Sequence, residues 1–278
     1  MLLEHGAEAR ALAGGTDLVV KMKQRRLVPR VVVNLKRIPN LDYVRVEPGR
    51  GLRIGALATL EMLNRSIDVR KRYPVLHDAV SCMGTLEIRN RGTVAGNLCN
   101  ASPAAETIPG LMVLGARAIL AGPSGARSIA VDELILGPGR TALEAGELLI
   151  EIEVPEPPPL HLHHQVGAYD KYSLRRMDLA VVGAAVLLEL DGLQCKTARI
   201  VLSAVGPTAF RASDAEAQLA NQPLDEAIIR TAAHAAAAQA SPKADLTGTV
   251  ESKRAAAEAL VQRVIRQALS RAGMRTAS

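Results

Sequence analysis

A proline-rich segment near the middle of this 278-residue chain limits how it can fold more than any other feature. Residues 155–165 read PEPPPLHLHHQ, and four of the first five are proline. Proline fixes φ and has no backbone N–H, so such a run cannot continue a helix or a central strand. The chain is long enough for two ordinary domains. We therefore predict a domain boundary within this segment.

Short apolar runs alternate with turns before this boundary. Strands are expected at residues 31–35 and 52–54, which proline or glycine bounds, and at residues 116–121 and 148–154. Helices are expected at residues 16–26, 60–65, 74–81 and 107–114. Thr59 is a suitable N-cap for the second of these helices, and Thr16 or Asp17 for the first.

The part after the boundary begins with strands and ends with helices. Residues 180–190 and 196–205 are rich in β-branched residues, and Asp191-Gly192 between them is a hairpin signal. Residues 225–240 and 252–272 predict two helices, the second of them amphipathic. Strands followed by helices indicate an α+β layer.

Composition excludes some classes of site. Hydrophobic residues make up 48% and aromatic residues only 2%, so aliphatic side chains must fill the core. A site of stacked aromatic rings, which single-stranded nucleic acids usually need, is therefore not expected, and no nucleic-acid partner is predicted. The net charge is +6, and a basic run lies at residues 21–26 (KMKQRR). We interpret this run as a solvated helix face, with an acidic or phosphate partner as the alternative.

The three cysteines, Cys82, Cys99 and Cys195, are widely spaced and form no C-x-x-C pair. This pattern argues against a disulfide framework and against an iron–sulfur or zinc site built from this chain alone. A reducing, cytoplasmic compartment is expected. The longest uncharged apolar run, residues 179–188, is far shorter than the ~20 residues of a membrane-spanning helix, so no transmembrane segment is expected.

Two glycine-containing segments are the candidate ligand-binding motifs. The first glycine segment is Ala13, Gly14, Gly15, Thr16, Asp17 and Leu18, where glycine allows positive φ and close approach to a ligand. The second glycine segment is Thr93, Val94, Ala95, Gly96 and Asn97. Backbone amides at the start of a helix bind anions, so the pair could hold a pyrophosphate. Tight turns need glycine equally, and this physics leaves both interpretations open.

Polar residues that could contact the same ligand follow the second glycine segment. Asn100 and Ser102 add an amide and a hydroxyl, and the carboxylate of Glu106 suits a ribose or polyol hydroxyl.

Residues 137–142 fit G-x-G-x-x-A but contain a proline, so we do not interpret them as a dinucleotide fingerprint. The three histidines of the proline-rich segment, His161, His163 and His164, could bind a metal, but we prefer to interpret them as ordinary linker residues.

Four segments carry a resemblance to a known family. They are AGGTDL (residues 13–18), RNRGTVAGNLCNASPAAETIPGLMVLGA (89–116), GELLIEIEVP (146–155) and YDKYSLRRMDLAVVGAAV (169–186). With the pattern between them, nearly the whole chain resembles the flavoprotein (medium) subunits of the xanthine dehydrogenase and carbon monoxide dehydrogenase family of molybdenum hydroxylases. The second and fourth segments are long and specific.

The resemblance implies an α+β fold in two parts. Residues 1–158 would form a two-lobed FAD-binding domain of the vanillyl-alcohol-oxidase (PCMH) type. Residues 166–272 would form a smaller C-terminal domain like that of CO dehydrogenase flavoproteins. Relatives carry about one more strand and helix before the first glycine segment, so the N-terminal strand and part of the first helix are expected to be missing here.

The resemblance also implies roles for individual residues. The two glycine segments would hold the FAD pyrophosphate, with Ser102 nearby. Glu106 matches an acidic residue, often Asp in relatives, that contacts the ribityl chain. Leu149 matches a backbone contact to the ring system, and Lys171 matches a lysine near the isoalloxazine, although an ordinary surface charge is an alternative for Lys171. Met83 replaces an aromatic residue that some relatives place against the ring, where methionine can pack without stacking.

The implied function is electron transfer in an oxidoreductase complex. FAD on this chain would take electrons from the [2Fe–2S] clusters of a small partner subunit and pass them to NAD⁺, a quinone or oxygen. Substrate would be hydroxylated at the molybdenum cofactor of a large partner subunit, in a dimer of heterotrimers. No catalytic residue and no metal ligand is assigned to this chain. The alternatives are a stand-alone FAD oxidoreductase of the vanillyl-alcohol-oxidase type and a non-catalytic partner-binding protein.

Overall fold

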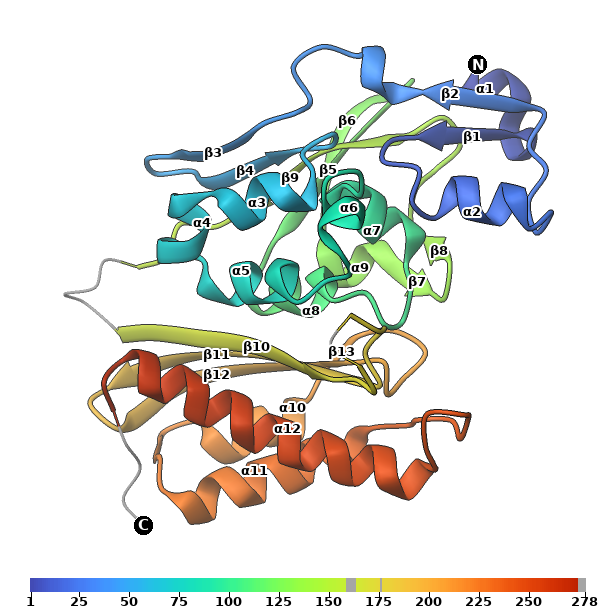
Figure 1. The fold of residues 1–278 in the computed structure, drawn as a ribbon. Coiled ribbons are helices and arrows are strands. Elements are labelled where there is room, and N and C mark those ends of the chain that lie inside the picture. The colour runs from blue at the N-terminus through green and yellow to red at the C-terminus, as the bar shows by residue number, and fades with distance from the viewer. Residues whose placement is uncertain (159–163, 176, 275–278) are drawn as a thin grey trace.

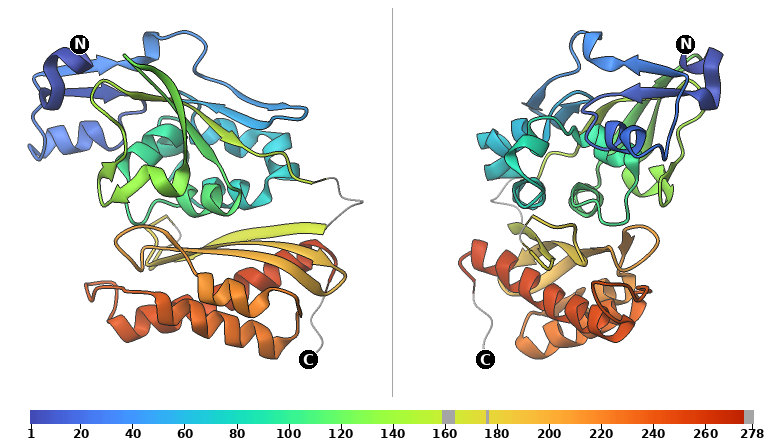
Figure 2. Two further views of the ribbon diagram at one scale, coloured as in Figure 1. Left: turned by 180° about the vertical axis from the view of Figure 1, so that it is seen from behind. Right: turned by 45° about the vertical axis from the view of Figure 1, so that its right-hand side comes forward.

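The computed structural model describes residues 1–158, 164–175 and 177–274, and sheets and helices alternate through it (Figure 1). A small N-terminal lobe adjoins a five-stranded sheet, and a layer of helices covers one face of that sheet. A second five-stranded sheet follows, and three long or medium helices cover its far side (Figure 2). The observed fold is therefore a mixture of helix and sheet, as predicted.

The N-terminal lobe is a β-α-β unit. Its strands pair in parallel, and its elements are α1 (Leu2–His5), η1 (Gly6–Glu8), β1 (Ala9–Leu12), α2 (Leu18–Lys23), β2 (Val31–Asn34) and η2 (Leu35–Arg37). The predicted helix at 16–26 is therefore too long. It ends early because Arg25 adopts a positive φ of 55°, and Arg26 N then donates to Lys21 O. The predicted strand at 31–35 loses Leu35, because the Asn34 side chain accepts from Lys36 N and starts η2.

The first five-stranded sheet is antiparallel, in the order β3-β4-β9-β5-β6. Its strands are β3 (Val44–Glu47), β4 (Gly51–Gly55), β5 (Arg117–Gly122), β6 (Gly125–Ala130) and β9 (Leu148–Val154). Leu52, Ile54 and Ile152 point into the core, whereas Arg53 points to the other face and pairs with Glu151 and Glu153. This alternation is the two-residue period of a strand with one apolar face.

Helices fill the layer beneath this sheet. They are α3 (Leu60–Arg65), α4 (Ile67–Arg72), α5 (Pro74–Ser81), α6 (Leu86–Arg89), α7 (Val94–Asn100), α8 (Thr107–Val113) and α9 (Val131–Leu134). The prediction for α3 is confirmed, including its cap, since the Thr59 side chain accepts from Met62 N. The short hairpin of β7 (Ile135–Gly137) and β8 (Arg140–Thr141) replaces the helix that a dinucleotide fingerprint would require at residues 137–142.

The C-terminal part contains a second antiparallel sheet and three helices. Its strands are β10 (His164–Tyr172), β11 (Val182–Asp191), β12 (Gln194–Ser203), β13 (Phe210–Arg211) and β14 (Gln222–Pro223), and its helices are α10 (Ser213–Leu219), α11 (Glu226–Gln239) and α12 (Val250–Arg271). Asp191 pairs with Gln194, which confirms the predicted hairpin. Strand β10 was not predicted, and it includes the last two residues of the proline-rich segment, His164 and Gln165. His161 and His163 lie outside the described residues.

Both faces of the C-terminal sheet are buried, and this explains the continuous apolar sequence of β11. Ala184, Val186 and Leu188 face the helices α10–α12, whereas Ala185 and Leu187 join the core of the first part. A strand that is covered on both sides loses the alternation of polar and apolar residues. Helices α5 and α8 provide the second cover, since α5 packs on β10 and α8 on β11 and β12.

Polar contacts reinforce this interface between the two parts. The Asp78 carboxylate on α5 accepts from Tyr169 N at 3.1 Å and from Arg271 Nη2 at 2.7 Å. Gly167 lets α5 approach closely, because an added Cβ would lie 2.4 Å from Val75 Cγ2. Within the described residues, no helix is both long and apolar enough to cross a membrane.

Candidate cofactor-binding site

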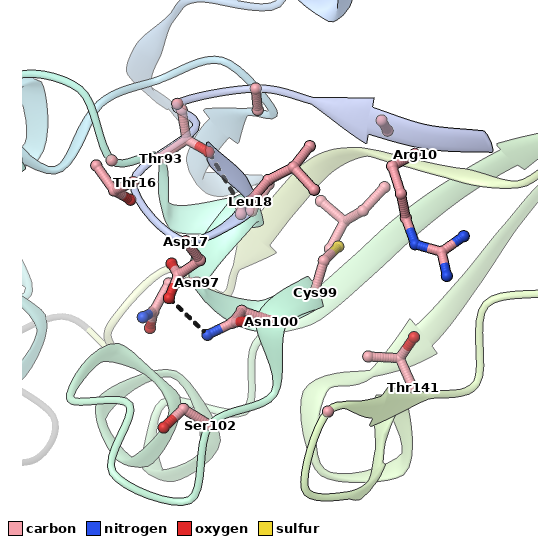
Figure 3. Close-up of a pocket in the computed structure, with 18 of the residues that line it drawn as sticks. Arg10, Thr16, Asp17, Leu18, Thr93, Asn97, Cys99, Asn100, Ser102 and Thr141 are labelled. Atoms are coloured by element: carbon pink, nitrogen blue, oxygen red, sulfur yellow. Dashed lines mark hydrogen bonds between the residues drawn. The ribbon is translucent and has the colours of Figure 1, made fainter. Parts of the chain in front are cut away.

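A cavity of about 1030 Å³ lies where the N-terminal lobe meets α7 and the β7–β8 hairpin (Figure 3). Its wall includes both glycine segments, Glu106 and the hairpin residues Gly139, Arg140 and Thr141. This volume is at the upper end of the range for small-molecule sites, which run from about 300 to 1,000 Å³. The cavity is therefore large enough for an extended ligand.

Close backbone packing explains the glycines of the first segment. Gly14 lies against the residues that precede the second segment, and an added Cβ would be 2.1 Å from Arg91 O and 2.9 Å from Gly92 Cα. Gly15 has a φ of 83°, which side chains disfavour. The two glycine segments are therefore packed directly on each other, and both face the same cavity.

The second segment is the beginning of a helix rather than a loop. Thr93 is the N-cap of α7, and its hydroxyl accepts from Gly96 N at 3.0 Å. Val94, Ala95 and Gly96 thus form the first helical turn, so of the two interpretations left open by the sequence this segment is a helix start and not a tight turn. Val94 N donates to Ala58 O and Gly96 N to the cap, so within the described residues Ala95 N is the first-turn amide that can donate at the cavity.

Asn97 continues this donor surface. Its Oδ1 accepts from Thr107 Oγ1 at 2.6 Å, so its amide nitrogen is the end that can donate to a ligand. Ser102, which follows the end of α7, also lines the cavity (Figure 3). Hydroxyl and amide groups of this kind fix the orientation of a ligand in an otherwise apolar pocket.

A chain of three side chains links the first glycine segment and α2 to the end of α7. Lys21 Nζ donates to Asn100 Oδ1 at 2.7 Å. Asn100 Nδ2 in turn donates to Asp17 Oδ1 at 3.1 Å (Figure 3). Thr16 or Asp17 was predicted as the cap of α2, and Asp17 is the N-cap residue, but its side chain makes no cap hydrogen bond. Its carboxylate is turned toward Asn100 at the end of α7 instead.

Glu106 forms a buried ion pair with the C-terminal sheet. Its Oε1 lies 2.9 Å from Lys171 Nζ, and the two side chains are only 3% and 4% exposed. Lys171 also donates to Asp178 O at 2.7 Å. The alternative that Lys171 is an ordinary surface charge is therefore wrong. Glu106 lines the cavity, whereas Lys171 lies behind it.

Most residues that sequence reasoning assigned to the site are brought together in one wall. Those that line the cavity are Ala13, Gly14, Gly15, Thr16, Asp17, Leu18, Thr93, Ala95, Gly96, Asn97, Ser102, Glu106 and Leu149. The other two do not reach it: Lys171 contacts it through Glu106, and Val94 is completely buried in the core. Met83 lines the cavity and is 8% exposed.

Several lining residues were not predicted. Arg10 of β1 and the hairpin residues Arg140 and Thr141 lie at the cavity, although residues 137–142 had been set aside. Lys21 lies there as well, although the basic run was interpreted as a solvated face. Met177 and Leu179 add exposed apolar side chains at the rim. The formal G-x-G-x-x-A match was the one available signal for the hairpin.

The cysteines near the site are unsuited to nucleophilic chemistry. Burial raises the pKa of the Cys82 thiol and of the Cys99 thiol to about 12 in each case. Both therefore stay protonated at neutral pH, and a thiol is a poor nucleophile. Within the part of the chain that the structure describes, no three His, Cys, Asp or Glu residues are placed to hold a metal ion. The cavity thus presents hydroxyl, amide, ammonium and carboxylate groups suited to binding.

Comparisons with known proteins cover nearly the whole chain. Residues 1–157 match the family described as the FAD binding domain in molybdopterin dehydrogenase, and residues 167–268 match the CO dehydrogenase flavoprotein C-terminal domain. The chain is 35% identical to the carbon monoxide dehydrogenase medium chain of Afipia carboxidovorans, over 98% of this chain and 93% of that protein.

Two further relatives agree. The chain is 33% identical to the 6-hydroxypseudooxynicotine dehydrogenase complex subunit alpha of Paenarthrobacter nicotinovorans, over 98% of this chain and 90% of that protein. A solved structure of carbon monoxide dehydrogenase from Hydrogenophaga pseudoflava superposes with a TM-score of 0.92 at 33% identity, covering 97% of this chain and 92% of that one.

Proposed function

Since this chain belongs to the family of FAD-binding subunits of molybdopterin dehydrogenases, we propose that it transfers electrons through a bound FAD. The FAD would take electrons from [2Fe–2S] clusters on a small partner subunit and deliver them to NAD⁺, a quinone or oxygen. The molybdenum cofactor would belong to a large partner subunit, and two heterotrimers would form the complex. The observation that carries the proposal is a large cavity whose wall contains residues of both glycine segments.

The residues at the cavity fit FAD. The close-packed glycine segments, the start of α7 and the donors of Thr16, Thr93 and Asn97 suit the two phosphates of a dinucleotide. The buried carboxylate of Glu106 suits the hydroxyls of a ribityl chain. When bound, FAD supplies the redox chemistry, because a flavin accepts electrons singly or in pairs.

The ion pair between Glu106 and Lys171 would set the electrostatics on one side of the flavin. Glu106 reaches the cavity, and Lys171 neutralises it from behind. A carboxylate that is paired and buried keeps its charge and its position, so it can accept hydrogen bonds from ligand hydroxyls. We propose that Lys171 acts on the flavin by positioning Glu106, while Leu149 and Met83 contact the ring system.

We also propose the PCMH type of fold for residues 1–158, with residues 166–272 as the C-terminal domain. The lobe that contains β1, β2 and α2 and the larger lobe built on the first five-stranded sheet would clasp the cofactor from two sides. The three cysteines are free thiols, which supports the proposed reducing, cytoplasmic location.

The test is to purify the chain together with the subunits encoded beside it. We expect the visible absorbance bands of a flavin, one FAD per chain after extraction, and bleaching of these bands when the complex is given its reducing substrate. A complex that copurifies with molybdopterin and iron–sulfur subunits but contains no flavin would refute the proposal. Turnover of a small alcohol by the isolated chain would favour the stand-alone oxidoreductase instead.

A further inference from the structure

We propose that Lys21 supplies the side-chain cation of the diphosphate site and that Asn100 positions it. The inference rests on the proposed function, because it assigns a residue to the phosphates of the same FAD. It concerns two residues to which neither the glycine motifs nor the family resemblance gives a role. Their placement in the cavity wall is the starting observation.

The geometry of the three side chains supports this assignment. Asn100 accepts from Lys21 at 2.7 Å through its oxygen. It donates to Asp17 at 3.1 Å through its nitrogen (Figure 3). Lys21 and Asp17 are four residues apart, on one side of α2, so Asn100 inserts between the two charges. Ala101 ends α7 in the left-handed conformation directly after Asn100, which places this amide against α2.

Charge explains why a cation is needed here. A diphosphate brings negative charge next to the glycine segments, where the Asp17 carboxylate already lies at the cavity wall. Lys21 is held beside Asp17 by a shared amide and offsets this repulsion. Among other cations at the cavity, Arg10 is engaged by the carbonyl oxygens of Ala7 and Ala9. Lys21 is thus a cavity-lining cation that Asn100 ties to Asp17 of the first glycine segment.

The ammonium group has donors to spare. A lysine ammonium carries three N–H donors, and Asn100 accepts one of them. The others can donate to phosphate oxygens while the bond to Asn100 keeps the group in place. Hydrogen bonds from a charged donor to a charged acceptor are about twice as strong as neutral ones.

The test compares ligands that share only part of FAD. Lys21→Met in the full chain should weaken binding of FAD and of ADP about tenfold, which corresponds to about 1.4 kcal/mol. Riboflavin, which has no phosphate, should bind as to the wild type. The matched control is Lys23→Met, because Lys23 lies on the same helix, carries the same charge and does not line the cavity. Affinities are measured by isothermal titration and by quenching of flavin fluorescence.

Three further readouts separate positioning from folding. Added salt should weaken FAD binding less in Lys21→Met than in the wild type, because the screened charge is gone. Asn100→Ala should weaken FAD binding, and adding it to Lys21→Met should cause little further loss. The thermal unfolding midpoint of the flavin-free Lys21→Met variant should equal that of the wild type.

The possible outcomes are distinguishable. A wild-type chain that binds no FAD refutes the proposed function itself. Wild-type affinity in Lys21→Met, or an equal loss in Lys23→Met, overturns only the inference about Lys21. Equal losses for FAD, ADP and riboflavin also overturn it, since they indicate general damage to the site.

Discussion

Replacement of Lys171 by methionine tests how the buried ion pair contributes to stability. The change removes the ammonium but keeps most of the aliphatic volume, and it leaves the carboxylate of Glu106 buried at 3% side-chain exposure without its partner. Loss of one member of a buried pair costs about 3–5 kcal/mol, because the remaining charge can be neither paired nor hydrated. Asp178 O also loses a hydrogen bond, which adds about 1 kcal/mol.

A second substitution isolates the cause. In Lys171→Met/Glu106→Met both charges are absent, and replacement of a whole buried pair by apolar residues is often close to neutral. We therefore expect the double variant to be more stable than Lys171→Met alone by about 2 kcal/mol or more. The measurement is urea unfolding of flavin-free protein, followed by circular dichroism at one pH and one protein concentration.

Two results would contradict this reasoning. A loss below about 1 kcal/mol in Lys171→Met would mean that the Glu106 carboxylate is hydrated in spite of its burial. A double variant less stable than the single one would mean that packing, and not the unpaired charge, causes the loss. Tyr172→Phe on the same strand is a control, because Tyr172 is 44% exposed.

Three more predictions, two on substitutions and one on thiol labelling, test other features of the structure. Gly14→Ala should lower the free energy of unfolding by about 1–3 kcal/mol and abolish high-affinity FAD binding, because the added Cβ would meet Arg91 O. The control is Gly137→Ala, where an added Cβ has no atom within 4 Å. It should match the wild type in urea unfolding and flavin titration. Asp78→Ala should cost about 2 kcal/mol or more in urea unfolding, because Arg271 and Tyr169 N both lose an acceptor; equal stability would contradict this role. Burial raises the pKa of the Cys82 and Cys99 thiols to about 12 and that of the Cys195 thiol to about 11. The native chain should therefore react slowly with iodoacetamide at pH 8. Fast labelling before unfolding would disprove this.

Local signals in the sequence were sufficient for much of the fold. The boundaries of α3, α5 and β9 follow from caps, a proline in the first helical turn and apolar runs, all of which act over a few residues. Strand β10 was missed because its sequence HQVGAYDKY follows the prolines and contains polar residues. Helix α5, which packs on this strand, is supplied by a distant part of the chain, which local reasoning does not include.

The candidate site shows the same limit. Most of the predicted lining residues lie at one cavity, because the glycine segments carry their own signal. Lys21 resembles its basic neighbours in the sequence, and only the fold brings it to Asn100, 79 positions away. The burial of Lys171 and its contact with Glu106, 65 positions away, likewise depend on how the two parts pack.

The double cover of the C-terminal sheet has a consequence for synthesis of the chain. Helix α8 is complete at Val113, but the strand β12 that it packs against ends only at Ser203. At about 5–20 residues per second, translation takes about 5–18 s to cross that interval. During this time the nascent chain exposes the apolar sides of α5 and α8 to solvent. Chaperones that bind apolar surfaces would therefore contact this protein before the C-terminal sheet covers α5 and α8. In a chain truncated at the proline-rich segment, these two helices would stay exposed.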